Sequence, residues 1–247
     1  MVRWKAQVNC LKLQKRLTWL GHATFQIISP QGKVILIDPW LEKNPACPPE
    51  CKQLEHVDLI LVTHGHTDHS GDVLRLAKQH HPTIIAMLEL MEWLASKGAD
   101  HTVELNKGGS LIFEGIKVTM THAVHSSSVE DEGQIQCVGE AAGYLLELEN
   151  GLKLYHAGDT DVFGDMALIR DLLAPDIALL PIGGGYTMGP QAAALATRFL
   201  GVTSVVPMHY GIFSACKGMP QELRSALDTL GLASVEVIEM IPDQTID

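Results

Sequence analysis

A run of three histidines and one aspartate stands out in the first third of the sequence. His64, His66, Asp68 and His69 form the pattern H-x-H-x-D-H directly after the apolar segment LILVT. Neutral imidazole and carboxylate are the usual ligands of zinc and similar divalent cations. Because neighbouring side chains in a tight turn point apart, alternate members of the run can face different ions. The run predicts a metal centre and argues against a merely solvated histidine-rich loop.

Polar side chains also stand at the ends of other short apolar segments. Histidine or aspartate ends the segments at 17–22, 33–39, 117–125, 152–160 and 204–210, and glycines end the segment at 176–185. These segments are rich in β-branched residues and bounded by Gly, Pro or Asp, which is typical of buried strands. Ligands of α/β proteins bind beyond strand ends, where loops gather polar groups. We therefore expect these side chains to meet at one edge of the fold.

Helical patterns lie between the predicted strands. Apolar residues recur at helical spacing over residues 71–81, 87–98, 165–175, 190–201 and 220–231. The last two begin with Pro at the first turn and end at a Gly, as helices commonly do. Strands that alternate with helices predict an α/β sandwich.

Composition narrows the possible functions. The 247 residues carry 18 Lys and Arg against 29 Asp and Glu, a net charge of −11, which argues against nucleic-acid binding. No apolar run approaches the roughly 20 residues of a membrane helix. The basic N-terminus lacks the apolar core of a signal peptide. The five cysteines, an odd number that includes Cys10, are expected to be reduced. We expect a cytoplasmic protein with no membrane partner.

The sequence resembles the metallo-β-lactamase fold superfamily. The H-x-H-x-D-H run is its signature, and six further motifs match in order: WLGHATF (19–25), LIDPW (36–40), THAVHSSS (121–128), HAGDT (156–160), LPIGGGYTMGP (180–190) and PMHYGIF (207–213). Together they look most like a branch of small metal-dependent hydrolases related to the ascorbate-phosphate lactonase. The resemblance covers residues 17–225 and implies a four-layer αββα sandwich. We expect one domain over residues 1–247.

The resemblance also implies two metal ions and their ligands. His64, His66 and a histidine of THAVHSSS would bind the first ion, Asp68, His69 and His209 the second, and Asp159 would bridge both. His122 and His125 are three residues apart, so they point to opposite faces of a strand. We favour His125, because it ends the apolar run and the family motif places its ligand just before the serines. The donor set suits Zn²⁺, with Mn²⁺ or Fe²⁺ as alternatives.

Such a centre predicts hydrolysis. Two bound ions lower the pKa of a bridging water and supply hydroxide, and Asp68 would accept or orient its proton. We expect cleavage of a small ester, lactone, amide or phosphodiester. The alternative is a non-catalytic metal-binding scaffold, but such a protein is expected to lack some ligands. The resemblance further implies a homo-oligomer.

Five other residues are candidates near the centre. His22 ends a strand, so it either contacts a ligand or substrate or is packed. His156 precedes Asp159 by three residues and could hydrogen-bond to a ligand. Asp38 would either orient a ligand imidazole or start a turn before a proline. The last two candidates are Tyr186 and Tyr210. Each would either donate a hydrogen bond to a developing oxyanion or pack as an aromatic residue in the fold.

Overall fold

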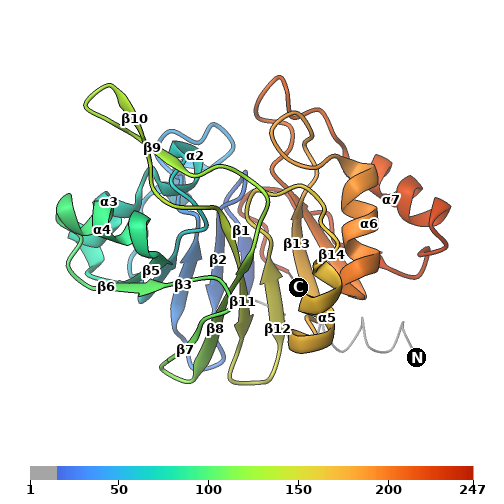
Figure 1. The fold of residues 1–247 in the computed structure, drawn as a ribbon, viewed down its shortest axis with the longest axis horizontal. Coiled ribbons are helices and arrows are strands. Elements are labelled where there is room, and N and C mark those ends of the chain that lie inside the picture. The colour runs from blue at the N-terminus through green and yellow to red at the C-terminus, as the bar shows by residue number, and fades with distance from the viewer. Residues whose placement is uncertain (1–15, 247) are drawn as a thin grey trace.

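Two β-sheets packed face to face form the centre of the protein, with helices on both outer sides (Figure 1). The structure is a computed structural model, and it describes residues 16–246. The basic N-terminal segment and Cys10 therefore lie outside the described residues, and one domain over residues 1–247 stays a prediction.

The first sheet has six strands whose order in space follows their order in the chain. The first two pairings are antiparallel and the last three are parallel. The strands are β1 (Leu17–Trp19), β2 (Phe25–Ile28), β3 (Val34–Ile37), β4 (Leu59–Leu61), β5 (Thr83–Met87) and β6 (Thr102–Leu105).

The second sheet has seven strands in the order β15-β14-β13-β12-β11-β8-β7. It repeats the design of the first sheet, because three antiparallel pairings are followed by three parallel ones. The strands are β7 (Ser110–Phe113), β8 (Ile116–His122), β11 (Ala142–Glu147), β12 (Lys153–His156), β13 (Ile177–Pro181), β14 (Ser204–Met208) and β15 (Glu236–Val237).

Helices cover the outer face of each sheet (Figure 1). The first sheet carries α3 (Val73–His80) and α4 (Leu88–Ser96), and the second carries α5 (Met166–Leu173), α6 (Pro190–Leu200) and α7 (Pro220–Thr229). Helix α6 begins with Pro and ends at Gly201, whose φ of 65° suits a residue without Cβ. All five helices fall within the ranges that the sequence predicted.

Three apolar cores separate the layers. One lies between the sheets and the other two lie between each sheet and its helices. The buried Tyr144 of β11 joins the sheets, because its hydroxyl lies 3.0 Å from the carbonyl oxygen of Val62 and 3.1 Å from that of Ile85. This is the four-layer αββα arrangement that the sequence predicted.

Three short elements complete the described part. They are the turn of 3₁₀-helix η1 (Pro49–Lys52), helix α2 (Thr67–Ser70) and a two-stranded hairpin of β9 (Ser128–Asp131) and β10 (Gln134–Cys137). Within residues 16–246, no helix has the length and apolar character needed to span a bilayer.

Candidate metal centre

The residues of the centre follow strands that run in one direction. β3 and β4 are parallel neighbours in the first sheet, and β12, β13 and β14 are parallel neighbours in the second. Asp38 follows β3, the histidine run follows β4, and Asp159 and His209 come soon after β12 and β14. Because parallel strands end at a common edge, side chains distant in the sequence meet there.

Two groups of ligand atoms result. Those of His64, His66 and His125 lie within 4.8 Å of one another, and we call this group the first position. Asp68, His69 and His209 form the second position. Their ligand atoms also lie within 4.8 Å of one another, and an atom of His22 lies within the same distance of them.

Asp159 lies between the two positions. Its Oδ2 is 3.0 Å from Nε2 of His209 and 3.7 Å from Nε2 of His125. The same oxygen is 4.0 Å from Nε2 of His64, and Asp159 Oδ1 is 3.4 Å from Nε2 of His69. The structure thus brings together all seven side chains that the sequence proposed as ligands, with the expected bridging residue in the middle.

The structure separates the two alternative histidines of the first position. His122 is the last residue of β8 and is exposed, with Nδ1 3.1 Å from Nζ of Lys107 and its ring against Phe163. His125 lies in the following loop, and its ring centre is 5.1 Å from that of His64. His125 is therefore the histidine of this segment that reaches the centre.

Hydrogen bonds to Asp38 and Thr63, which follow strands of the first sheet, orient two of the ligand imidazoles. His69 Nδ1 is 2.8 Å from Asp38 Oδ2, so the N–H donates to the carboxylate. His64 Nδ1 is 2.9 Å from Thr63 Oγ1, which in turn donates to Asp38 Oδ2 at 2.7 Å. Both rings thus direct Nε2 into the centre, an arrangement typical of metal-bound histidine. Asp38 makes the imidazole contact that was one of its two sequence-based interpretations.

The loop of the first position depends on Gly65. A Cβ there would lie 2.6 Å from a methyl group of Val138 and 2.9 Å from the carbonyl oxygen of Ser128. The Gly65 N–H also donates to Ser127 Oγ at 3.2 Å. Residues at the base of the β9–β10 hairpin therefore pack directly on the ligand loop.

Unpaired polar atoms at the centre fit a bound cation. His69 Nε2, His209 Nε2 and Asp159 Oδ1 are buried and lack a hydrogen-bond partner of good geometry. Buried polar groups without partners are rare and need an explanation. Imidazole nitrogen and carboxylate oxygen are metal ligands, so a divalent ion at the second position would account for these atoms.

The pKa values of the centre reflect two opposing effects, burial and the charges of neighbouring residues. Burial lowers the pKa of His64 well below its ordinary value. Burial acts the same way on His209, but Asp159 outweighs it and raises the pKa to about 9. Burial would raise the pKa of Asp159, yet the His69 and His209 charges bring it well below its usual range. An ionised carboxylate at the middle of the centre attracts cations.

Two of the other candidates, His22 and His156, differ in whether they touch a ligand. His22 Nε2 is 3.0 Å from Asp68 Oδ2, so this residue touches a ligand directly. His156 does not: its Nε2 is 3.0 Å from the carbonyl oxygen of Ala23, and its Nδ1 accepts the Gly158 N–H, next to Asp159. His156 thus fixes the loop that carries the bridging residue.

The two tyrosines differ in whether they line the cavity at the centre. Tyr186 is 61% exposed and lines the cavity at the centre, where its ring lies edge-on to Phe213. Tyr210 stacks on Trp19 with ring centres 5.7 Å apart, and burial raises its pKa to about 12. Tyr210 does not line this cavity, so of its two sequence-based interpretations the structure favours the packed aromatic.

A cavity of about 550 Å³ opens onto the centre. Its lining combines metal-ligand side chains with Trp40 and Phe213, whose ring centres lie 6.1 Å apart in a stacked arrangement. Lys43 supplies the one cationic amine among the residues that line the cavity. The cavity suits a small molecule with an apolar part.

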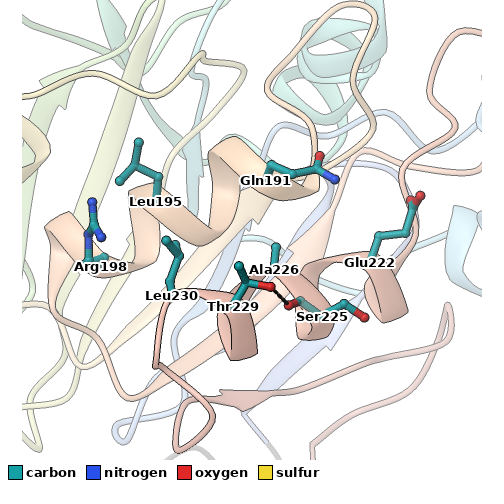
Figure 2. A pocket seen from close by; sticks show the side chains of 8 residues that line it. All are labelled: Gln191, Leu195, Arg198, Glu222, Ser225, Ala226, Thr229 and Leu230. Carbon is teal, nitrogen blue, oxygen red and sulfur yellow. Dashed lines mark hydrogen bonds between the residues drawn. The ribbon is translucent and has the colours of Figure 1, made fainter.

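A second cavity of about 580 Å³ lies between α6 and α7, away from the centre. Figure 2 shows side chains of both helices around it, among them Leu195, Ala226 and Leu230. Gln191 and Arg198 of α6 and Glu222 of α7 are its charged or amide residues. It contains no histidine, cysteine or aspartate, so the hydrolytic chemistry belongs to the first cavity.

Sequence reasoning missed two contacts. It left His22 without a defined partner, although the residue follows a strand and a glycine in WLGHATF. It did not place Cys216, whose Sγ is 3.8 Å from Nδ1 of His209. The His22–Asp68 contact joins segments 46 residues apart. The Cys216–His209 contact is formed across an irregular loop. No local pattern shows either contact.

Known proteins resemble this chain in sequence and in fold. A family model described as "Beta-lactamase superfamily domain" matches residues 33–210. A "UPF0173 metal-dependent hydrolase" of Koribacter versatilis is 46% identical over 230 residues, covering 93% of this chain and 97% of the relative. Another of that name from Solibacter usitatus is 50% identical over 211 residues, covering 85% and 91%. The solved structure of Igni18, a metallo hydrolase of Ignicoccus hospitalis, superposes with a TM-score of 0.81 at 35% identity, covering 92% and 95%.

The chain belongs to the metallo-β-lactamase fold superfamily. Within it, the chain is a metal-dependent hydrolase, similar over nearly its whole length to the bacterial relatives of that name. The link to the ascorbate-phosphate lactonase stays a prediction.

Proposed function

We propose that the protein is a dinuclear metal-dependent hydrolase that cleaves a small ester, lactone, amide or phosphodiester. The observation that supports this most is the place of Asp159, whose two carboxylate oxygens face histidines of both positions. Three imidazoles on one side and two imidazoles with a carboxylate on the other provide enough donors for an ion in each position. We expect Zn²⁺, with Mn²⁺ or Fe²⁺ as alternatives.

The bound ions would polarise the scissile group and lower the pKa of a water molecule to supply the nucleophile. Asp68 is placed to orient that water or accept its proton, because its carboxylate lines the cavity beside the second position. Its pKa stays below the ordinary value, since the neighbouring His69 charge and the His22 hydrogen bond outweigh the effect of burial. Asp68 is therefore ionised at neutral pH and able to take up a proton.

The cavity walls would position the substrate. The stacked rings of Trp40 and Phe213 supply an apolar part of the cavity lining, and the exposed Tyr186 can donate a hydrogen bond. A cavity of about 550 Å³ takes a small molecule, and the net charge of −11 disfavours a nucleic acid. Homo-oligomeric assembly and a cytoplasmic location remain predictions, and light scattering on the purified protein tests the first.

A substrate panel tests the proposed function. The purified protein would be assayed on a lactone, a carboxylic ester and bis(p-nitrophenyl) phosphate, before and after chelation and after Zn²⁺ or Mn²⁺ is restored. We expect hydrolysis of at least one class, loss on chelation and recovery with metal, and no hydrolysis by Asp68→Asn. Bound metal with no hydrolysis of any class would favour the non-catalytic scaffold.

A further inference from the structure

His22 lies among the ligand atoms of the second position but differs from them in its surroundings. It follows β1 and is fully buried, with a φ of 59° between Gly21 and Ala23. Its carbonyl oxygen accepts the indole N–H of Trp19 at 2.9 Å and the backbone N–H of His209 at 3.1 Å. A left-handed backbone is uncommon outside glycine and persists where surrounding contacts impose it, often at functional sites.

The ring is held as firmly as the backbone. Its centre is 3.9 Å from the ring centre of His209, and it meets Trp40 and Phe213 edge-on. Its Nε2 is 3.0 Å from Asp68 Oδ2. Position alone would allow His22 either to bind the second ion or to donate a hydrogen bond to Asp68.

The surroundings of Nδ1, the other ring nitrogen of His22, distinguish these two roles. A metal-bound imidazole almost always donates its other N–H to an acceptor. His69 and His64 have such partners at Nδ1, whereas His22 Nδ1 is buried and has none among residues 16–246. If Nε2 bound a metal, the ring proton would lie on Nδ1 without an acceptor. With the proton on Nε2, it has one in Asp68.

Asp68 needs such a partner more than the other ligands of its position. Its side chain is 24% exposed and faces the cavity, whereas those of His69 and His209 are at most 1% exposed. Within the described part of the chain, its carboxylate makes no other hydrogen bond, because Nε2 of His69 and His209 lie 3.7 and 3.8 Å away.

From these contacts the geometry points to His22 as a positioning residue: its Nε2–H fixes the Asp68 carboxylate for the second metal ion, and His22 is not itself a ligand. An ionised carboxylate only accepts hydrogen bonds, so His22 must be the donor. The inference rests on the proposed two-metal function, because it assigns His22 to one of the two positions.

Two substitutions separate the hydrogen bond from the backbone conformation. In His22→Gln the side-chain amide reaches as far as Nε2 and restores a donor. In His22→Asn the amide stops near the place of Nδ1, but Asn tolerates a positive φ better than Gln does. A backbone role would therefore favour the Asn variant, and a hydrogen-bond role would favour the Gln variant. His122→Asn, an exposed histidine outside the centre, is the matched control.

The measurement is calorimetric titration of chelated protein with Co²⁺, with the visible spectrum recorded after each equivalent. We expect His22→Asn to weaken binding of the ion in the second position about 10–100-fold, the usual effect of losing an outer partner of a metal ligand. We expect His22→Gln to stay within about threefold of wild type and to keep its spectrum. Binding of the ion in the first position should change little in any variant.

Two outcomes overturn the inference alone, provided that the wild type binds two ions. If both variants lose the ion of the second position to the same extent and its spectrum changes, His22 is a ligand. If the Asn variant binds as tightly as wild type, only the backbone matters. A wild type that binds fewer than two ions overturns the proposed function, and this inference with it.

Discussion

The first and second positions of the centre share Asp159 but are built differently. The first consists of three imidazoles, and both His66 and His125 are only partly buried. The second adds Asp68 to two nearly inaccessible histidines, and Asp38 orients one of them from within the fold. Carboxylates offset the charge of an ion, and outer hydrogen bonds hold ligands in place. We therefore expect the second position to bind its ion more tightly.

Replacing the shared residue should have the largest effect. Asp159→Ala removes the carboxylate that faces histidines of both positions. We expect it to lose both ions and to reduce kcat/KM by more than the ~10–100-fold that loss of an outer partner causes. Metal content and hydrolysis would be measured on the same sample. Two ions retained with full activity would show that Asp159 is not a bridge.

Replacing a ligand of the first position should affect that position alone. We expect His125→Ala to weaken one equivalent, the weaker of the two, and to leave the tighter one unchanged. His122→Ala is the control, since that side chain contacts Lys107 and Phe163 outside the centre. Titration of both variants with Zn²⁺ makes the comparison. A weaker ion in His122→Ala and not in His125→Ala would reverse their assigned roles.

Replacing Asp38, the carboxylate that accepts a hydrogen bond from His69, should affect mainly the second position. Asp38→Asn weakens the acceptor for the Nδ1–H of His69 and for the Thr63 hydroxyl. We expect about 10–100-fold weaker binding of the tighter ion. The same titration measures it. If instead the weaker ion is lost first, the proposed order of the two affinities is wrong.

Replacing the hydroxyl that joins the sheets should leave both positions intact. Tyr144→Phe removes hydrogen bonds to the carbonyl oxygens of Val62 and Ile85. The Ile85 oxygen keeps the Val62 N–H as a donor. We expect a loss of ~1–2 kcal/mol in the free energy of unfolding, measured by urea denaturation, with unchanged metal affinity. A variant with altered metal affinity would show that sheet packing tunes the centre.

The sequence predicted the long helices, and the side chains that it proposed as ligands lie close together in the structure. Amphipathic spacing and the Pro and Gly at the ends of α6 are local signals. The H-x-H-x-D-H run places four residues of metal-ligating types within one short segment. The strands β2, β5, β6, β7, β11 and β15 and the β9–β10 hairpin were not anticipated. Most of them are short, and β5 is followed directly by α4, so no turn residue marks the boundary.

Contacts between distant segments could not be predicted from the sequence. The distance between His22 and Asp68 depends on how β1 and α2 meet at the sheet edge, not on any local pattern. The same holds for Tyr210, which packs on Trp19 instead of lining the cavity. Cys216 lies closer to His209 in the chain, but their contact depends on the path of the irregular loop between them. Motifs identify which residues act together, and packing decides which of their atoms touch.

Elemental analysis of the purified protein tests the central claim most directly. Metal per chain would be counted after dialysis, for wild type and for Asp159→Ala. Our account predicts about two divalent ions per wild-type chain and clearly fewer in the variant. It would be contradicted by wild-type protein that is folded, contains almost no metal and takes up none when Zn²⁺, Mn²⁺ or Fe²⁺ is added.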